Sequence, residues 1–138
     1  DRAGEAAAAV HSGWMGTVLE IVPQAVAILE AAGISPSRLW AAIGPCIEEA
    51  AFEVGPEVAA RFDERFVARG GYARPHVDLV AVVRDQLTRS GVPAEQIERV
   101  GQCTHQRRDL YFSYRRDRDP SGRQLSFVGF TSPEAGTP

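Results

Sequence analysis

Apolar residues recur with helical spacing in the first third of the chain. Between residues 17 and 33 they follow one another at intervals that mark one face of a helix packed on a sheet. The positions are Val18, Val22, Ala25, Leu29 and Ala32. Because proline removes a hydrogen bond from a helix interior, we predict that this helix either kinks at Pro23 or begins near Ile21. Gly33 is a natural residue for its end.

Two further segments show the same periodicity. Apolar side chains four residues apart predict a helix over residues 55–66, which begins at Gly55-Pro56. Another apolar run predicts a helix over residues 79–90, with Asp78 as a favourable N-cap.

Short apolar runs between these helices are typical of buried strands. We predict strands over residues 5–10, 38–44, 97–102 and 123–130, the second of them buried on both faces. The alternation of strands with helices predicts a layered α/β or α+β architecture in which some neighbouring strands run parallel.

The composition excludes several kinds of partner and chemistry. A formal net charge of -3 over 138 residues gives no overall attraction to nucleic acid or to an anionic membrane. No apolar run approaches the ~18 residues of a membrane span. All 15 basic residues are arginine, so the chain has no lysine for a Schiff base or a phosphate loop. Without a signal-peptide pattern we expect a cytoplasmic protein, and without an initiator methionine we expect residue 1 to lie inside a longer chain.

Three predicted strand ends carry side chains that can do chemistry, namely His11, Cys46, and Cys103 with His105. A set of cysteines and histidines suits zinc or copper, although the spacing matches no zinc-finger pattern. A Cys–His nucleophile pair is a second interpretation, and small buried side chains are a third. The two cysteines are far apart in sequence, and we do not expect a disulfide between them.

The turn after the first predicted strand is the most distinctive of these ends. Gly13 and Gly16 permit a close backbone approach, and Trp14 between them offers a large flat surface. His11 at such a turn is a metal ligand, an acid or base, or a structural hydrogen-bonding residue.

Aromatic and arginine side chains are concentrated in the segment Phe112-Ser113-Tyr114-Arg115-Arg116-Asp117. With Arg123 downstream, its arginines could bind phosphate or a carboxylate through forked hydrogen bonds, and its aromatics could stack on a planar base. The alternative is a solvated turn whose arginines pair with Asp109, Asp117 or Asp119.

In order and spacing, these motifs resemble the laccase-like multicopper polyphenol oxidase family, also described as purine nucleoside phosphorylases and as peptidoglycan editing factors. The resemblance runs from residue 1 to about residue 130. The matching segments are Ala9-Val10-His11-Ser12-Gly13-Trp14-Met15-Gly16, Ile43-Gly44-Pro45-Cys46-Ile47, Phe52-Glu53-Val54-Gly55, Cys103-Thr104, and residues 112–117 with Gly122-Arg123.

The resemblance implies an α+β fold, a mixed β-sheet sandwich flanked by helices like that of the cytotoxic-necrotizing-factor (CNF) cysteine hydrolases. It implies phosphorolysis of adenosine, inosine and methylthioadenosine, accompanied by adenosine deamination. The partners would be a purine nucleoside and phosphate, with no nucleic acid or membrane, and a homodimer is left open. The competing interpretations are a copper-dependent polyphenol oxidase and a non-catalytic module.

The resemblance also implies one zinc ion, or copper in an oxidase, held by two histidines and one cysteine. His11 matches the last of these ligands and is the expected catalytic position, whereas the other two belong to motifs that precede residue 1. We therefore expect residues 1–130 to be the C-terminal portion of a single laccase-like domain, followed by a flexible tail at 131–138. The 138 residues alone are not expected to bind the metal tightly. Met15 departs from the family, which usually has a basic residue there.

Residue chemistry, and not the family's motifs, assigns the remaining roles. We predict that arginines bind the phosphate and that aromatic rings stack on the base. These residues are Arg115, Arg116 and Arg123 for the anion, and Trp14, Phe112 and Tyr114 for the base.

Overall fold

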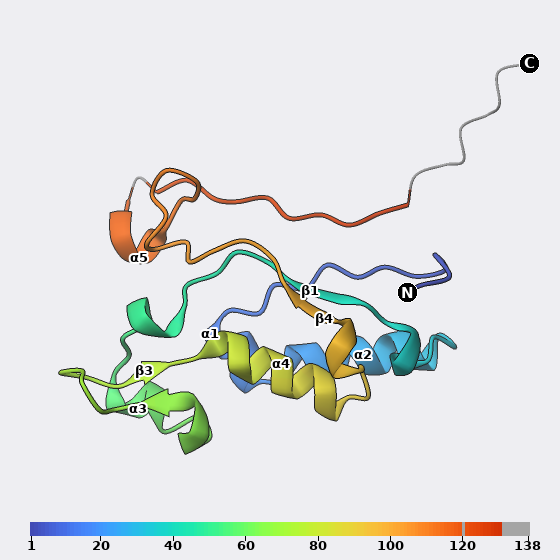
Figure 1. Cartoon of the computed structure of the whole chain (residues 1–138), viewed down its shortest axis with the longest axis horizontal. Coiled ribbons are helices and arrows are strands. Elements are labelled where there is room, and N and C mark those ends of the chain that lie inside the picture. Colours follow the sequence, from blue (N-terminus) through green and yellow to red (C-terminus); the bar gives the residue numbers. More distant parts are fainter. Residues whose placement is uncertain (120, 131–138) are drawn as a thin grey trace, which may run out of the picture.

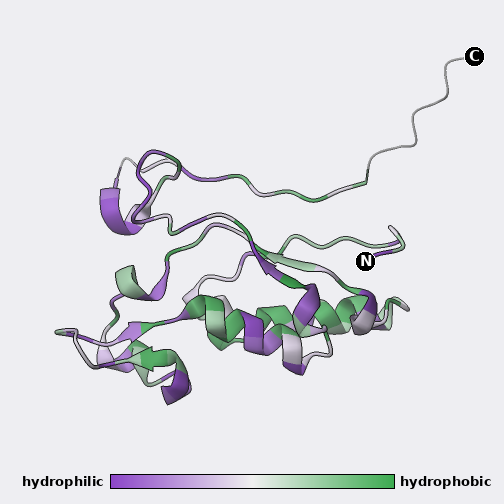
Figure 2. Cartoon of the chain, viewed as in Figure 1, coloured by the Kyte–Doolittle hydropathy of each residue, from purple (hydrophilic) through white to green (hydrophobic). Residues whose placement is uncertain are grey.

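Two eleven-residue helices and a pair of short parallel strands enclose the larger of two hydrophobic cores. The structure is a computed structural model and describes residues 1–119 and 121–130. In Figure 1, α2 (Ile21–Ala31) and α4 (Leu79–Arg89) lie together beneath β1 (Ala41–Ile43) and β4 (Ile97–Arg99). Figure 2 shows hydrophobic residues along these elements, whereas α5 (Tyr114–Asp117) is hydrophilic. The buried residues of this core are Val22, Val26, Ile34, Leu39, Leu87, Val92 and Ile97.

Helix α2 begins where its proline can be accommodated. The N-cap residue Glu20 has a left-handed backbone with φ of 56°, and Pro23 falls in the first turn, where backbone N–H groups have no partner within the helix. At the other end Gly33 has φ of 89°, and the N–H of Ile34 donates to Leu29 O at 3.0 Å. Both the start and the end predicted for this helix are confirmed.

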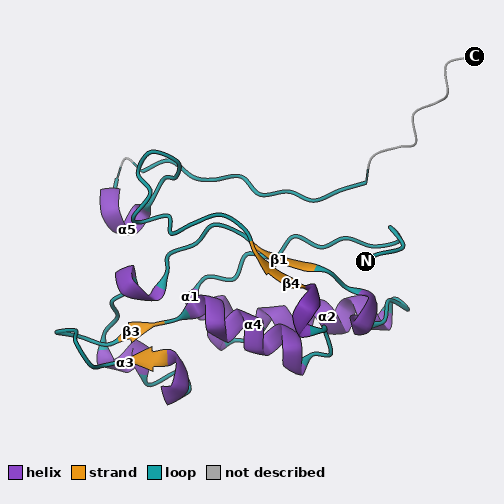
Figure 3. Cartoon of the chain, in the orientation of Figure 1, coloured by secondary structure: helices purple, strands orange, loops and turns teal. Residues whose placement is uncertain are grey.

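The strands form two separate pairs, drawn in orange in Figure 3. β1 and β4 are parallel, with Ala41 opposite Ile97 and Ile43 opposite Arg99. β2 (Val67–Ala68) and β3 (His76–Val77) are antiparallel and lie in a second core. The buried residues of this second core are Phe52, Val54, Ala59, Val77 and Leu79. The α+β class is therefore confirmed.

The remaining helical pieces are short. They are α1 (Trp14–Val18), α3 (Pro56–Ala59), α5, and 3₁₀ turns at Pro36–Arg38, Glu49–Ala51, Glu64–Phe66 and Ala94–Gln96. The helix predicted over residues 55–66 is wrong beyond Ala59. Its C-terminal part is a separate 3₁₀ turn, which begins because the Asp63 carboxylate accepts a hydrogen bond from the N–H of Arg65 at 3.0 Å.

The predicted strands are longer than those in the structure. Residues 5–10 and 123–130 form no strand and are largely exposed, with Val10 at 42% and Leu125 at 86%. A strand needs a neighbour for its backbone N–H and C=O groups, and no described segment forms a ladder with either of these two. β1 and β4 retain only three residues each. Ala42, the middle residue of β1, is exposed, whereas Ala41 and Ile43 pack against the larger core, so only one face of the strand is covered and the prediction of burial on both faces is wrong.

The expected sandwich of packed sheets is also absent from residues 1–119 and 121–130, because each sheet has only two short strands. The likeness to the cysteine hydrolase fold stays a prediction. The tail predicted at 131–138 lies outside the described residues. Within the described ranges, none of the helices has both the length and the apolar surface to cross a membrane.

The cap of α4 provides a direct test of the fold. The Asp78 carboxylate accepts a hydrogen bond from the N–H of Ala81 at 2.9 Å, as predicted for an N-cap. We expect Asp78→Ala to lower the free energy of unfolding by about 1 kcal/mol, measured by urea denaturation. Asp78→Asn keeps the acceptor oxygen and should lose much less. Equal losses in the two variants would contradict the capping role.

Candidate functional site

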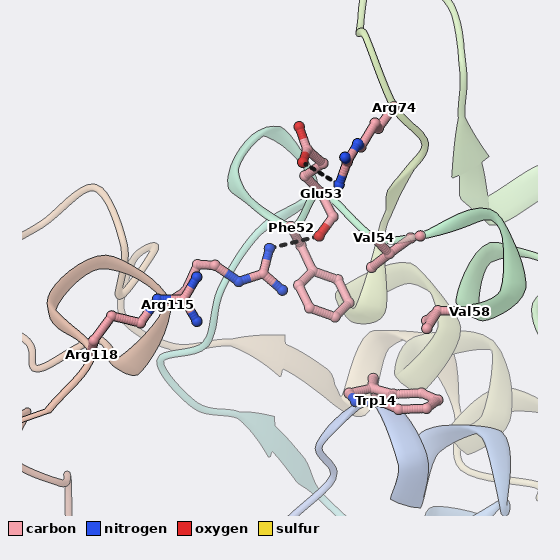
Figure 4. Close-up of a pocket in the computed structure, with 9 residues that line it drawn as sticks. Trp14, Phe52, Glu53, Val54, Val58, Arg74, Arg115 and Arg118 are labelled. Carbon is pink, nitrogen blue, oxygen red and sulfur yellow. Dashed lines mark hydrogen bonds and ion pairs between the residues drawn. The ribbon is translucent and has the colours of Figure 1, made fainter.

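A cavity of about 380 Å³ lies beside the second core, next to α5 (Figure 4). Its walls come from α1, residues 52–58, the loop before β3, and the segment that contains α5. The lining residues are Trp14, Phe52, Glu53, Val54, Gly55, Val58, Arg74, Arg115 and Arg118. Two aromatic side chains and three arginines therefore border one space, whose volume lies in the range of small-molecule sites.

Trp14 is held in place by buried polar contacts under α1. The hydroxyl of Thr17, which is fully buried, donates to Gly13 O at 3.0 Å and pairs with Ser12 Oγ at 2.9 Å. From α4, Gln86 Nε2 donates to Thr17 O at 2.8 Å. The Trp14 ring packs against the second core. These contacts fix the start of α1 and present the indole ring to the cavity.

The opposite wall is an extended segment joined to β3 and the loop before it. The N–H of Val54 donates to Pro75 O at 2.9 Å, and the N–H of Val77 donates to Phe52 O at 3.2 Å. Phe52 is buried in the second core and also borders the cavity. The ring is thus held by main-chain pairing on one side and by apolar packing on the other.

Arg115 reaches from α5 to this segment, as Figure 4 shows. Its Nη1 donates to Glu53 O at 2.6 Å, and its guanidinium carbon lies 5.2 Å from the centre of the Phe52 ring. Arg74 approaches the Glu53 carboxylate at 3.8 Å. Three arginines and the Glu53 carboxylate line the cavity, and the Glu57 carboxylate lies against Gly55 in the same wall, so the arginines outnumber the carboxylates there. This excess of positive charge favours an anion.

Arg116, the next residue, uses its guanidinium within the fold. Nη1 donates to the carbonyls of Thr104 and His105 at 2.8 and 2.9 Å, and Nη2 donates to that of Tyr111 at 2.9 Å. Nη2 also bonds the Asp117 carboxylate at 2.7 Å, and the hydrogen bonding from Arg116 lowers the pKa of that carboxyl below its usual range. Arg116 therefore fastens α5 to the loop after β4.

Six residues are predicted from sequence to hold the base and the anion, and they fall into two groups. Trp14 and Arg115 line the cavity of Figure 4. The others lie elsewhere: Phe112 and Arg116 line a second hollow of about 420 Å³, and Arg123 lies 5.6 Å from the ring centre of Tyr114. For all six residues, contact with substrate stays a prediction.

Three residues that line the cavity were not predicted from the sequence as site residues, namely Phe52, Arg74 and Arg118. Phe52 begins one of the segments that carry the family resemblance, and that was the available signal for it. Arg74 and Arg118 lie among other charged residues in loops, where no periodicity or spacing distinguishes one arginine from the next.

His11 lies just before α1 and is exposed. Its ring rests against the backbone of Gly13, where a Cβ atom would meet Nε2 at 3.2 Å. Within the described part of the chain, no three side chains of His, Cys, Asp or Glu gather as metal ligands. Protein zinc sites have three or four such ligands, so the described residues do not complete a metal site by themselves. The role of His11 as a ligand stays a prediction.

The chain is similar to known proteins in sequence. Residues 1–131 match the family described as multi-copper polyphenol oxidoreductase laccase. A Bacteroides thetaiotaomicron protein named purine nucleoside phosphorylase is 37% identical over 136 residues, which cover 93% of this chain and 50% of the relative. A protein named adenosine deaminase RL5, from an unknown prokaryotic organism, is 34% identical over 125 residues, or 86% of this chain and 48% of the relative.

Solved structures agree with this relationship. The Geobacillus stearothermophilus protein YlmD superposes with a TM-score of 0.70 at 30% identity, covering 79% of this chain and 43% of YlmD. The Bacillus licheniformis hypothetical protein YfiH gives a TM-score of 0.72 at 30% identity, with 79% and 44% coverage. The chain thus spans about half the length of the relatives it matches.

The contacts of Arg116 predict a structural effect that a surface arginine lacks. We expect Arg116→Lys to lower the urea midpoint clearly, because an ammonium group cannot bond three separated carbonyls and Asp117 at once. Arg108→Lys is the matched control, since Arg108 is exposed and has a single ion pair to the same carboxylate at 3.3 Å.

The effect should also depend on pH. Because the pKa of Asp117 is lowered in the folded chain, its pair with Arg116 stabilises above the unfolded carboxyl pKa and loses this effect as pH falls through the lowered value. The difference between wild type and Arg116→Lys should therefore shrink in acid. Identical midpoints for the Arg116 and Arg108 variants at neutral pH would contradict this role.

Proposed function

The chain belongs to the multi-copper polyphenol oxidoreductase laccase family, and from this premise we propose that it supplies the substrate-binding wall of a purine nucleoside phosphorylase. The observation that carries the proposal is the cavity bordered by Trp14, Phe52 and three arginines. Several relatives carry the name purine nucleoside phosphorylase. The proposed substrates are adenosine or inosine together with inorganic phosphate.

The aromatic wall suits the nucleoside. A purine is flat and apolar on its faces, so it gains from contact with a large ring whose edge is already packed. Trp14 packs against the second core and borders the cavity, whereas Phe52 is only 6% exposed, has the Arg115 guanidinium over its ring and supports the wall from behind. The base therefore finds a fixed ring in Trp14, and little side-chain entropy is lost when it binds.

The arginines suit the second substrate. Nη1 of Arg115 donates to a backbone carbonyl, which orients the guanidinium group. The remaining N–H groups of the guanidinium can still donate to a ligand. Arg74 and Arg118 add positive charge at the same cavity. Guanidinium groups bind phosphate oxygens through paired hydrogen bonds. The proposed site thus holds an anion beside a planar base.

Phosphorolysis needs a phosphate held next to the nucleoside. A phosphate oxygen attacks C1′ of the ribose while the bond from C1′ to the purine nitrogen breaks, and the bonding electron pair leaves with the base. The products are ribose 1-phosphate and the free purine. The arginines position the attacking anion, and the aromatic rings hold the leaving base, so that both meet C1′ in one orientation. No step is assigned to a metal, because the described residues do not form its ligand set.

Two further candidate reactions come from the names of the family and of one relative. The family description favours oxidation of phenols, and the relative named adenosine deaminase favours hydrolysis of the 6-amino group. The three reactions release different products: ribose 1-phosphate, an oxidised phenol, or inosine with ammonia. Product analysis with adenosine, phosphate and a phenol in parallel therefore distinguishes them.

Nucleoside binding can be followed through tryptophan fluorescence. The chain has two tryptophans, Trp14 at the cavity and Trp40 elsewhere. We expect adenosine with phosphate to change the emission of the wild-type chain saturably and to change that of Trp40→Phe equally. In Trp14→Phe the signal should be lost. A folded chain without saturable binding, or a full signal from Trp14→Phe, would contradict the proposed site.

The phosphate assignment has its own test. We expect Arg115→Gln to weaken phosphate binding about tenfold, equivalent to ~1.4 kcal/mol, because a charge-assisted hydrogen bond is lost. Calorimetric titration of phosphate in the presence of adenosine measures this. Arg61→Gln removes an exposed arginine that does not line the cavity, and it should behave as wild type. Equal affinity in both variants would remove Arg115 from the phosphate site.

A further inference from the structure

The two cysteines of the chain lie just beyond the ends of β1 and β4. In the ladder of these strands Ile43 is registered with Arg99, and the N–H of Val100 donates to Ile43 O at 2.9 Å. Beyond the ladder, the N–H of Thr104 donates to Cys46 O at the same distance of 2.9 Å. This bond follows one additional residue on the β4 side, where Gly101 has φ of 81°, and it places Cys103 beside Cys46.

This placement brings the two thiols within reach of one another. The hydrogen bond from Thr104 to Cys46 O holds the two segments together at this point. The charge of Cys103 is among the causes that raise the pKa of the Cys46 thiol, so the two sulfurs lie near one another. The N–H of Glu48, two residues after Cys46, donates to Cys103 Sγ at 3.5 Å, which brings the main chain beside Cys46 up to the second sulfur. Both cysteines are free in the structure.

We propose that Cys46 and Cys103 form a dithiol site that reacts reversibly with low-molecular-weight disulfides such as glutathione disulfide. The Cys46 thiolate attacks one sulfur of the small disulfide, so that a mixed disulfide forms and one small thiolate leaves. The Cys103 thiolate then attacks Cys46 Sγ and expels the second small thiolate. The protein loses two electrons and two protons, and one disulfide is reduced to two thiols.

The order of attack follows from exposure. Cys103 is only 2% exposed, whereas Cys46 is partly exposed and meets the reagent first. Burial raises the pKa of the Cys46 thiol, and Glu48, Cys103 and Asp78 act in the same direction, while Arg99 opposes them. Because the thiolate is the nucleophile, exchange should be slow at neutral pH and should accelerate as pH rises.

The bond would join two segments that both lead to the cavity. After Cys46 the chain reaches residues 52–55 of the wall, and after Cys103 it reaches the loop whose carbonyls bind Arg116. Oxidation would therefore tie the two segments together.

The test uses the reduced full chain in buffers with varied ratios of glutathione to glutathione disulfide. Free thiols are then alkylated and the intact mass is measured. We expect a product lighter by two hydrogen atoms, with neither alkyl group nor glutathione attached, whose yield is independent of protein concentration and is reversed by dithiothreitol. Peptide mapping should join Cys46 to Cys103. Stable glutathione adducts, disulfide-linked dimers, or two free thiols at every ratio would overturn the proposal.

Single substitutions separate the two steps. Cys103→Ala should stop the reaction at a stable mixed disulfide on Cys46, whereas Cys46→Ser should leave the buried Cys103 unmodified in the folded chain. If Cys103→Ala does not fold, peptide mapping of wild type together with Cys46→Ser still decides the outcome. A rapid glutathione adduct on Cys103 in folded Cys46→Ser would contradict the proposed order of attack.

Discussion

The parallel pairing of β1 with β4 is the contact on which the positions of the other parts depend. It is only three residues long, yet it aligns two stretches of chain more than fifty residues apart in sequence. Both stretches then run to the same cavity, one supplying Phe52 and Glu53 and the other supplying α5 with Arg115. The hydrogen bond from Arg115 to Glu53 O joins them again at the far end. Between these two points lie the paired cysteines.

Short pairing of this kind needs reinforcement, and partly exposed arginine side chains provide it. Arg99 of β4 donates to the carbonyls of Ile43 and Gly44 at 3.1 and 2.7 Å and forms an ion pair with Glu48 at 3.0 Å. Arg116 repeats this use of a guanidinium group one loop later. A chain without lysine can rely on arginine here, because five N–H donors in a planar group satisfy several carbonyls at once.

The two long helices, α2 and α4, were predictable because their signals are local. Asp78, Gly33 and Pro23 each act on backbone groups within a few residues of their own position, and all three are found as expected. A strand forms only where another segment pairs with its backbone, and the sequence does not show which segment that is. Residues 5–10 and 123–130 have the composition of strands, but without a ladder partner among the described residues they remain extended and exposed.

At the cavity, too, the sequence indicates what chemistry a residue can do but not where the fold places it. Arg115 and Arg116 are equivalent in sequence, and both suit an anion. In the structure one borders the cavity and the other binds backbone carbonyls, because adjacent helical residues point about 100° apart. Sequence therefore predicts anion chemistry for this segment, but only the fold shows which guanidinium borders the cavity.

The charge at the cavity helps to decide which of the three candidate reactions the site suits. A neutral phenol or the neutral 6-amino group of adenosine has no need of a positive site, whereas phosphorolysis must hold a phosphate beside the nucleoside. Three arginines and the Glu53 carboxylate line the cavity, with the Glu57 carboxylate against Gly55 in its wall, in a chain whose overall charge is -3. The arginines at the cavity are therefore a local concentration of positive charge in a chain that is negative overall. Among the reactions named for the relatives, it fits the one that consumes an anion.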